Sequence, residues 1–220
     1  MKKIHLFVCL LLVLRLNGQT DAPAEPRRLM FFAGADYSLL GAGSGSSDPS
    51  APWMDFQQEA AGLSFGAALR FPLYQYLYFQ PELAFSYSAH HATLWADNRP
   101  GERVRYTFSE LELPVHLVFS KPFGNLPMRS NILFGGRLGL NAATTQPENG
   151  VALFRERLGI DLGLGLEFNW GKWHLQPEFL YSHGMNDLHA DTGSPYDRTV
   201  NRILRDKMCL RLVIGKRARG

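Results

Sequence analysis

Charged side chains recur in this sequence inside segments that are otherwise apolar, at positions that fall on one face of an extended chain. Nine of them stand out: Arg70, Glu82, Glu112, His116, Arg137, Asp161, Glu167, Glu178 and Arg211. Three guanidinium groups, five carboxylates and one imidazole can form ion pairs and hydrogen bonds within a dry space. Because a buried charge without a partner is costly, we expect these residues to form a structural network that lines a closed lumen.

Other chemistry receives less support from the residue types and their spacing. Ser86, Ser88 and His90 lie at alternate positions, so on a strand they form a line and not the relay of a hydrolase. The glycines of "DLGLGLEF" fall on one face of a continuous strand with no helix after it, which argues against a nucleotide loop. Histidines near the loop bases, such as His183, offer a metal site as an alternative to plain solvated side chains. We predict no catalytic residue, no cofactor and no metal.

The first 18 residues are predicted to be a secretory signal peptide. Lys2 and Lys3 are its basic start, residues 6–14 its apolar run, and cleavage falls near Gly18; a short buried helix is the alternative. The leader contains three of the cations that give the formal net charge of +3, the third being Arg15, and no acid. The mature chain is therefore close to neutral, and the basic pI is no indication of nucleic-acid binding.

The cysteines and the hydropathy of the sequence further narrow the class of protein. Cys9 lies inside the leader, so Cys209 remains alone and no disulfide is expected within the mature chain. No run of eighteen apolar residues follows position 18, so a membrane-spanning helix is not predicted. Any crossing of a membrane would have to be made by strands.

Beyond the leader, apolar and polar residues alternate with a period of two, as in half-buried strands. In "RLGIDLGLGLEFNW" the leucines share one face with Ile160, while the glycines share the other with Asp161 and Glu167. Such segments are predicted near 28–38, 59–71, 76–89, 103–119, 129–142, 157–170, 172–183 and 205–215. Val104, Tyr106 and Phe108 are out of phase with the apolar face that follows, which we interpret as a bulge near Ser109.

The connections between these eight segments alternate in length. "PLYQ", "KPFGNLP" and "WGK" are short, whereas stretches such as "LGAGSGSSDPSAPWMDFQ" and "HATLWADNRPG" are long and polar. This is typical of an all-β, eight-stranded antiparallel transmembrane barrel with short periplasmic turns and long extracellular loops. Side chains fill a lumen of that size, so we expect it to be closed. A soluble sandwich or lipocalin-like barrel, with the apolar face inside, is the alternative.

This prediction divides the chain into a leader (1–18), a short N-terminal segment (19–27), the barrel (28–215) and a basic tail (216–220). Two strands contain the tripeptide Gln-Pro-Glu, in which Pro81 and Pro177 have the parity of the lipid face. Each proline forfeits a ladder hydrogen bond, so a local bulge or kink is expected at both positions.

Several segments resemble the PorT-like outer-membrane β-barrel proteins of Bacteroidetes over most of positions 28–215. They are "FQPELAFSYS", "YTFSELELPVHLVFSKP" and "DLGLGLEFNWGKWHLQPEFLYSHGMNDL". The segments "FGNLPMRSNILFGGRLGLN" and "NRILRDKMCLRLVIG" are similar to the founding PorT branch. The resemblance implies an eight-stranded barrel in the outer membrane, and in the founding branch a component required for type IX protein secretion.

Two functions follow as hypotheses. The first is a non-enzymatic component or assembly factor of a type IX secretion apparatus, whose partners are outer-membrane lipid and other secretion proteins, with no nucleic acid or nucleotide. The second is a surface binding module whose long loops capture a ligand or host protein, with Trp53, Trp95 and Tyr196 as contact residues. A barrel enzyme acting on outer-leaflet lipid ranks third.

Overall fold

The structure is a computed structural model that describes residues 27–44, 53–56, 59–96, 99–124, 126–142, 152–190 and 200–216. The predicted leader with its cleavage site, nearly all of the segment 19–27, the tail after Lys216 and Tyr196 lie outside the described residues. No described helix is long and apolar enough to cross a membrane.

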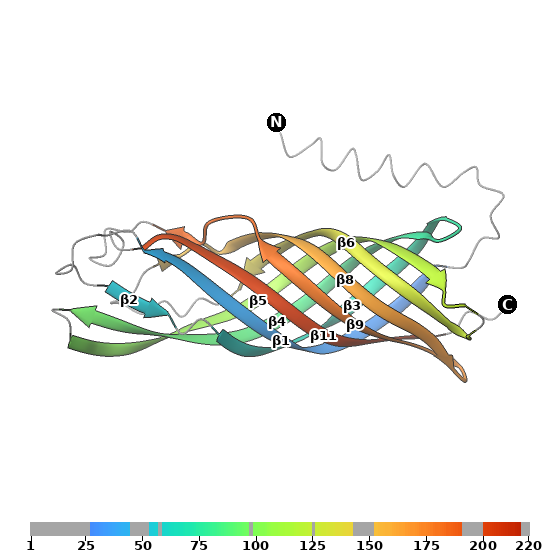
Figure 1. Ribbon diagram of the computed structural model, residues 1–220, viewed down its shortest axis with the longest axis horizontal. Coiled ribbons are helices and arrows are strands. Elements are labelled where there is room, and N and C mark those ends of the chain that lie inside the picture. Colours follow the sequence, from blue (N-terminus) through green and yellow to red (C-terminus); the bar gives the residue numbers. More distant parts are fainter. Residues whose placement is uncertain are drawn as a thin grey trace, which may run out of the picture.

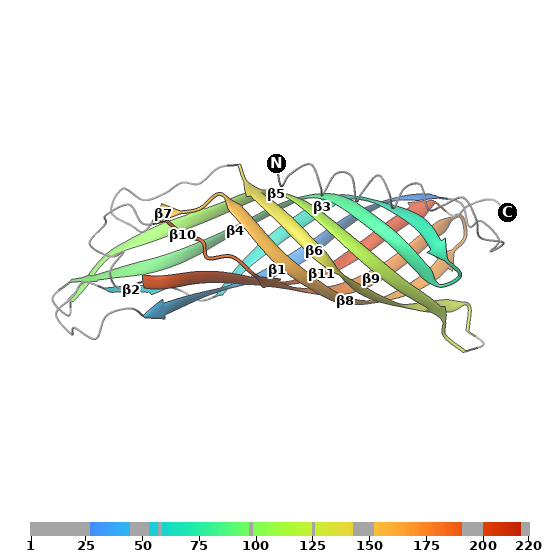
Figure 2. The same cartoon turned by 90° about the horizontal axis from the view of Figure 1, so that it is seen from above.

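Eight long strands form the barrel: β1 Arg28–Ser44, β3 Glu59–Tyr74, β4 Leu77–Ala96, β5 Arg99–Pro122, β6 Met128–Asn141, β8 Glu156–Trp170, β9 Trp173–Gly184 and β11 Val200–Lys216. Each is antiparallel to both neighbours, and the pairings of β4 with β5 and of β1 with β11 close the ring. The strands tilt strongly around an elongated barrel (Figures 1 and 2). The predicted eight-stranded antiparallel transmembrane barrel is confirmed.

The period-two pattern decides which face meets lipid. On β8, Leu162 and Leu164 are 54% and 60% exposed, whereas Asp161 is completely buried. Leucine, isoleucine and phenylalanine cover the outside of the other strands in the same way. The apolar side chains therefore form the lipid-facing belt, which contradicts the soluble alternative because that fold needs them inside.

The short turns after β3, β5 and β8 lie at one end of the barrel, which is the periplasmic end. Met30 near the start of β1 pairs with Gly215 near the end of β11, so both ends of the barrel chain lie there as well. The turn between β8 and β9 is only Gly171 and Lys172, and Gly171 has a φ of 60°, a conformation that side chains with a Cβ rarely adopt.

At the extracellular end, β4 and β5 form a hairpin that projects beyond its neighbours (Figure 1). The prediction of a long polar loop at "HATLWADNRPG" is wrong, because β4 continues to Ala96 and β5 starts at Arg99. A short strand, β2 Trp53–Phe56, pairs with β4 here, and β7 Ala152–Leu153 pairs with β10 His189–Ala190 nearby. At 24 residues, β5 is far longer than the about 9–11 that a tilted strand needs to cross a membrane.

The predicted bulge near Ser109 is also wrong. The register of β5 against β4 runs unchanged from the pair of Val104 with Ala92 to the pair of Phe119 with Leu77. Val104, Tyr106 and Phe108 are buried in the lumen. The phase of the strand is therefore constant, and what changes along it is the chemistry of the inward face, from apolar near the outside to charged in the middle.

Neither lipid-side proline shifts the strand register. Pairs on either side of Pro81 keep the same register between β3 and β4, and the same holds around Pro177 between β8 and β9. On the opposite edge both prolines stay in the ladder, Pro81 against Val115 and Pro177 against Leu212. The expected bulges are absent because proline lacks only the N–H, so the strand stays extended and forfeits contacts on one edge alone.

Candidate functional site

The centre of the lumen holds a chain of ion pairs that links opposite walls of the barrel. Arg211 lies between two carboxylates, with Nη1 2.6 Å from Glu82 Oε2 and Nε 2.6 Å from Glu178 Oε2. Glu82 Oε1 is 3.1 Å from His116 Nδ1, and His116 Nε2 is 2.9 Å from Asp161 Oδ2. These five residues come from β4, β5, β8, β9 and β11, so their contacts tie together strands far apart around the ring.

The chain continues through a second arginine toward the extracellular side. Arg137 Nη2 is 2.8 Å from Asp161 Oδ2, and its Nη1 donates to Glu112. Lys207 Nζ lies 2.6 Å from Glu112 Oε1 and 3.4 Å from Asp36 Oδ2. Glu112 is completely buried and forms ion pairs with three cations, Arg137, Lys207 and, at 3.6 Å, Arg157, so it is the junction of this part of the network.

A periplasmic branch joins the same network through a glutamine. Arg70 Nη1 is 3.0 Å from Glu167 Oε2, and Arg70 Nε donates to Gln80 Oε1 at 2.7 Å. Gln80 Nε2 in turn donates to Glu82 Oε1 at 2.7 Å. All nine sequence-predicted residues are therefore buried in the lumen and connected to one another; their stabilising role remains a prediction.

The sequence prediction omitted five lumen charges: Asp36, Glu110, Arg157, Arg205 and Lys207. Among the described residues, seven acids and six Arg or Lys cations are buried, against the five acids and three cations expected. The alternation in the sequence could have identified all five, because every omitted residue has the parity of an inward position on its strand. Near balance of charge explains how so many ionised groups are accommodated in one narrow space.

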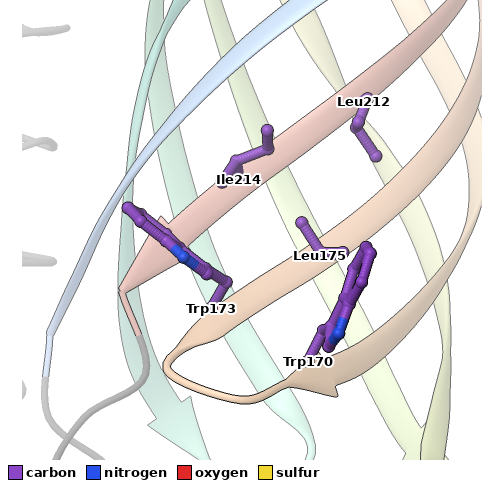
Figure 3. A pocket seen from close by; sticks show the side chains of 5 residues that line it. All are labelled: Trp170, Trp173, Leu175, Leu212 and Ile214. Carbon is purple, nitrogen blue, oxygen red and sulfur yellow. The ribbon is translucent and has the colours of Figure 1, made fainter.

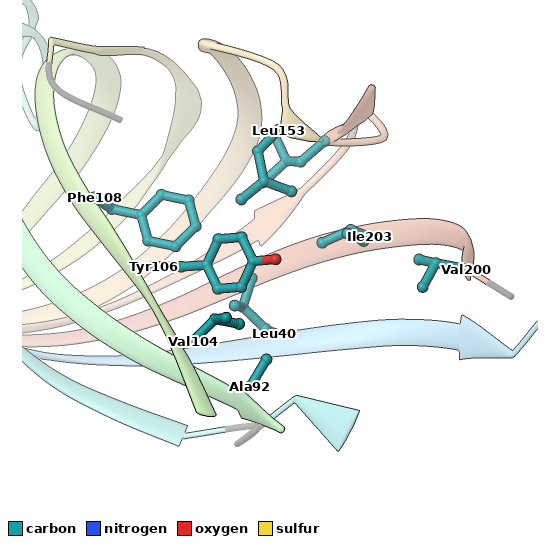
Figure 4. Close-up of a cluster of buried hydrophobic side chains, with 9 residues drawn as sticks. Leu40, Ala92, Val104, Tyr106, Phe108, Leu153, Val200 and Ile203 are labelled. Atoms are coloured by element: carbon teal, nitrogen blue, oxygen red, sulfur yellow. The ribbon is translucent and has the colours of Figure 1, made fainter. Parts of the chain in front are cut away.

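An apolar cluster closes the extracellular end of the lumen, and we name it the extracellular plug (Figure 4). It consists of Leu40, Ala92, Val104, Tyr106, Phe108, Leu153, Leu188, Val200 and Ile203. Two hydrogen bonds hold it in place: Leu188 N donates to the backbone oxygen of Ile203 at 2.9 Å, and Ile203 N donates to the side-chain oxygen Asp187 Oδ1 at 2.8 Å. The guanidinium of Arg205 lies 4.3 Å from the centre of the Phe108 ring, joining network and plug.

The serines and histidine that share one face of β4 are part of this interior. Ser86 Oγ donates to Glu112 Oε1 at 2.9 Å, and Ser88 Oγ accepts from Arg205 Nη2 at 2.9 Å. His90 is completely buried, with its ring edge-on to Phe108. Both hydroxyl groups are thus engaged in lumen contacts. No group of three or more possible metal ligands is found in the part of the chain that the structure describes.

Fold and interior define a small outer-membrane β-barrel with a filled lumen. Its fold is similar to that of the outer membrane protein OprG from Pseudomonas aeruginosa, with a TM-score of 0.55 and 10% identity over 92% of this chain and 100% of that chain. Neisserial surface protein A aligns with a TM-score of 0.48 and 10% identity, over 86% of this chain and 99% of that chain. No family model and no curated protein sequence matches the chain. At such low identity the likeness to OprG supports the fold alone.

Proposed function

We propose that this chain is a non-enzymatic outer-membrane component of PorT type, acting as a scaffold or assembly factor of a type IX protein secretion apparatus. The observation that carries this proposal is the closed interior. Paired charges fill the middle of the lumen and the extracellular plug covers its outer end. A barrel with such an interior offers no path for a protein, so its contribution to secretion lies in contacts made by its two ends.

The segments that carry the resemblance lie where a closed barrel needs them. Glu112 of "LELPV" is the junction of the lumen network. In "PEFLYSHGMNDL", Glu178 pairs with Arg211, while Asn186 Oδ1 accepts from Leu158 N at 2.7 Å and so anchors the start of the outer loop. The segments that carry the resemblance therefore build the interior of the barrel, and contacts with a partner are left to its two ends.

The turn between β5 and β6 is the best candidate contact surface at the periplasmic end. Phe123 and Leu126 are each 54% exposed. Phe123 N donates to Met128 O at 2.9 Å and Leu126 N donates to Phe123 O at 3.2 Å, so the turn backbone is ordered by its own hydrogen bonds. Two exposed apolar side chains on such a turn fit a hydrophobic patch of another secretion subunit.

Deletion of the gene, with cargo measured in the culture medium, tests the proposal. We expect cargo to be retained in the cells and secretion to return with the wild-type chain. A chain with Phe123→Ser and Leu126→Ser should reach the outer membrane folded yet restore secretion poorly. Tyr74→Ser, which changes a residue 65% exposed at the end of β3, beside another periplasmic turn, is the matched control. Normal secretion in the deletion strain contradicts the proposed function.

One observation favours the surface binding module as a second candidate. The projecting β4–β5 hairpin presents exposed Arg103 and Arg105 beyond the lipid-facing belt, and Trp53 of β2 is the backbone partner of Trp95 on β4. Removing the projecting part of the hairpin, and joining the shortened β4 and β5 by a turn, should then abolish capture of a surface ligand and leave secretion intact. Loss of secretion in that variant instead would assign the hairpin to the secretion role.

A further inference from the structure

A groove lies on the lipid-facing surface where β8, β9 and β11 reach the periplasmic end. Figure 3 shows its five lining residues: Trp170, Trp173, Leu175, Leu212 and Ile214. Its volume is about 400 Å³ and its lining is almost entirely apolar. Trp170 and Trp173 are 73% and 58% exposed and flank the two-residue turn, so they stand as two walls at the membrane interface.

Two lysines stand at the periplasmic mouth of this groove. Lys172 lies in the turn between the two tryptophans, and Lys216 is the cross-strand partner of Trp173 on β11. Both side chains are exposed. Leu175, Leu212 and Ile214 are reached by moving along the strands toward the middle of the membrane. The site is therefore amphiphilic, apolar along its length and cationic at one end.

We propose that the groove is a binding site for one anionic phospholipid of the periplasmic leaflet. An acyl chain lies between the tryptophan rings against the leucine and isoleucine side chains, and the headgroup phosphate contacts Lys172 and Lys216. The complementarity of a cationic mouth and an apolar channel selects such a lipid over a zwitterionic one, and each lysine near the surface contributes about a fivefold preference. This site is independent of the proposed role in secretion.

Tryptophan fluorescence tests the site in the folded barrel. With Trp53→Phe and Trp95→Phe, only the two groove tryptophans remain in the chain after the leader. Phosphatidylcholine vesicles then receive a small fraction of brominated phosphatidylglycerol or, separately, of brominated phosphatidylcholine. We expect the anionic lipid to quench several-fold more strongly at equal mole fraction. Equal quenching by the two lipids overturns the proposal.

Matched substitutions separate a built site from general attraction to a charged membrane. Lys172→Gln should reduce the preference about fivefold, whereas Lys121→Gln, an exposed lysine at the periplasmic end of β5, should leave it unchanged. Ile214→Phe fills the groove and should release lipid retained through purification, as counted by native mass spectrometry; Leu164→Phe, on the lipid-facing belt, should not. Equal effects of the paired variants contradict the proposal. Heat-modifiable migration on gels confirms that each variant is folded.

Discussion

Replacing Glu112 by alanine should destabilise the barrel more than almost any surface change. The carboxylate accepts hydrogen bonds from Arg137, from Lys207 at 2.6 Å and from Ser86 at 2.9 Å. Without it, Arg137 keeps Asp161 and Lys207 keeps only the longer contact of 3.4 Å to Asp36. Removing one partner of a buried pair costs about 3–5 kcal/mol. Glu112→Gln retains the shape and loses the charge, for which we expect about 1.5–3 kcal/mol.

Urea unfolding in detergent micelles, followed by heat-modifiable migration on gels, measures this loss. Glu156→Ala is the control, because Glu156 is an exposed acid on β8 and its loss should change the free energy of unfolding by about 0.5 kcal/mol or less. The double variant Glu112→Ala with Arg137→Ala should lose less than the sum of the single variants, since the second change removes a charge that the first left without a partner. A midpoint for Glu112→Ala equal to that of Glu156→Ala would refute a stabilising network.

Three other predictions test the fold. A spin label at Leu164 should be accessible to oxygen in the bilayer, and one at Glu167 should be shielded from it. The reverse result would mean that the apolar face lines the lumen and the charged face lies outside. Gly135→Ala should cost about 1–3 kcal/mol, because a Cβ there would lie 2.0 Å from a backbone oxygen, while Gly136→Ala meets nothing closer than 3.8 Å and should be nearly neutral in urea unfolding. Asp187→Ala should make the outer loops more sensitive to protease without shifting the unfolding midpoint of the barrel; unchanged digestion would mean that its hydrogen bonds do not hold the plug.

The parts of this fold that follow a strict period of two were predictable from sequence. On β8 every inward position from Gly159 to Glu167 is small or charged and every outward one from Leu158 to Leu166 is apolar, so the strand, its faces and the placement of Asp161 and Glu167 follow directly. The same reasoning placed nine charges in the lumen. It did not specify which acid pairs with which cation, because strand tilt and register, and not parity, decide which inward positions face one another across the lumen.

The errors occurred where an inward face is apolar. Val104, Tyr106 and Phe108 were interpreted as a shifted lipid face because hydrophobicity alone does not distinguish burial in lipid from burial in the plug. The extension of β4 and β5 was predicted to be a loop for a different reason: its residues are largely polar, and polarity does not distinguish a loop from a hairpin that projects beyond the membrane. Lys207 and Arg205 were also omitted, although they have the parity of Arg211 and are buried in the lumen.

The residues that stabilise the barrel and the residues available for contacts with other proteins lie in different parts of the molecule. The segments around Glu112 and Glu178, which carry the family resemblance, build the interior. Removing a charge there leaves its cation buried without a partner, which costs the full desolvation free energy of that cation. The contacts proposed with other proteins lie at the rims, where Phe123 or Arg105 is exposed and substitution is cheap for the fold. A barrel can therefore keep its interior and exchange its partners. Variants at the periplasmic turn and the outer hairpin, and not in the lumen, are the ones that separate secretion from surface binding.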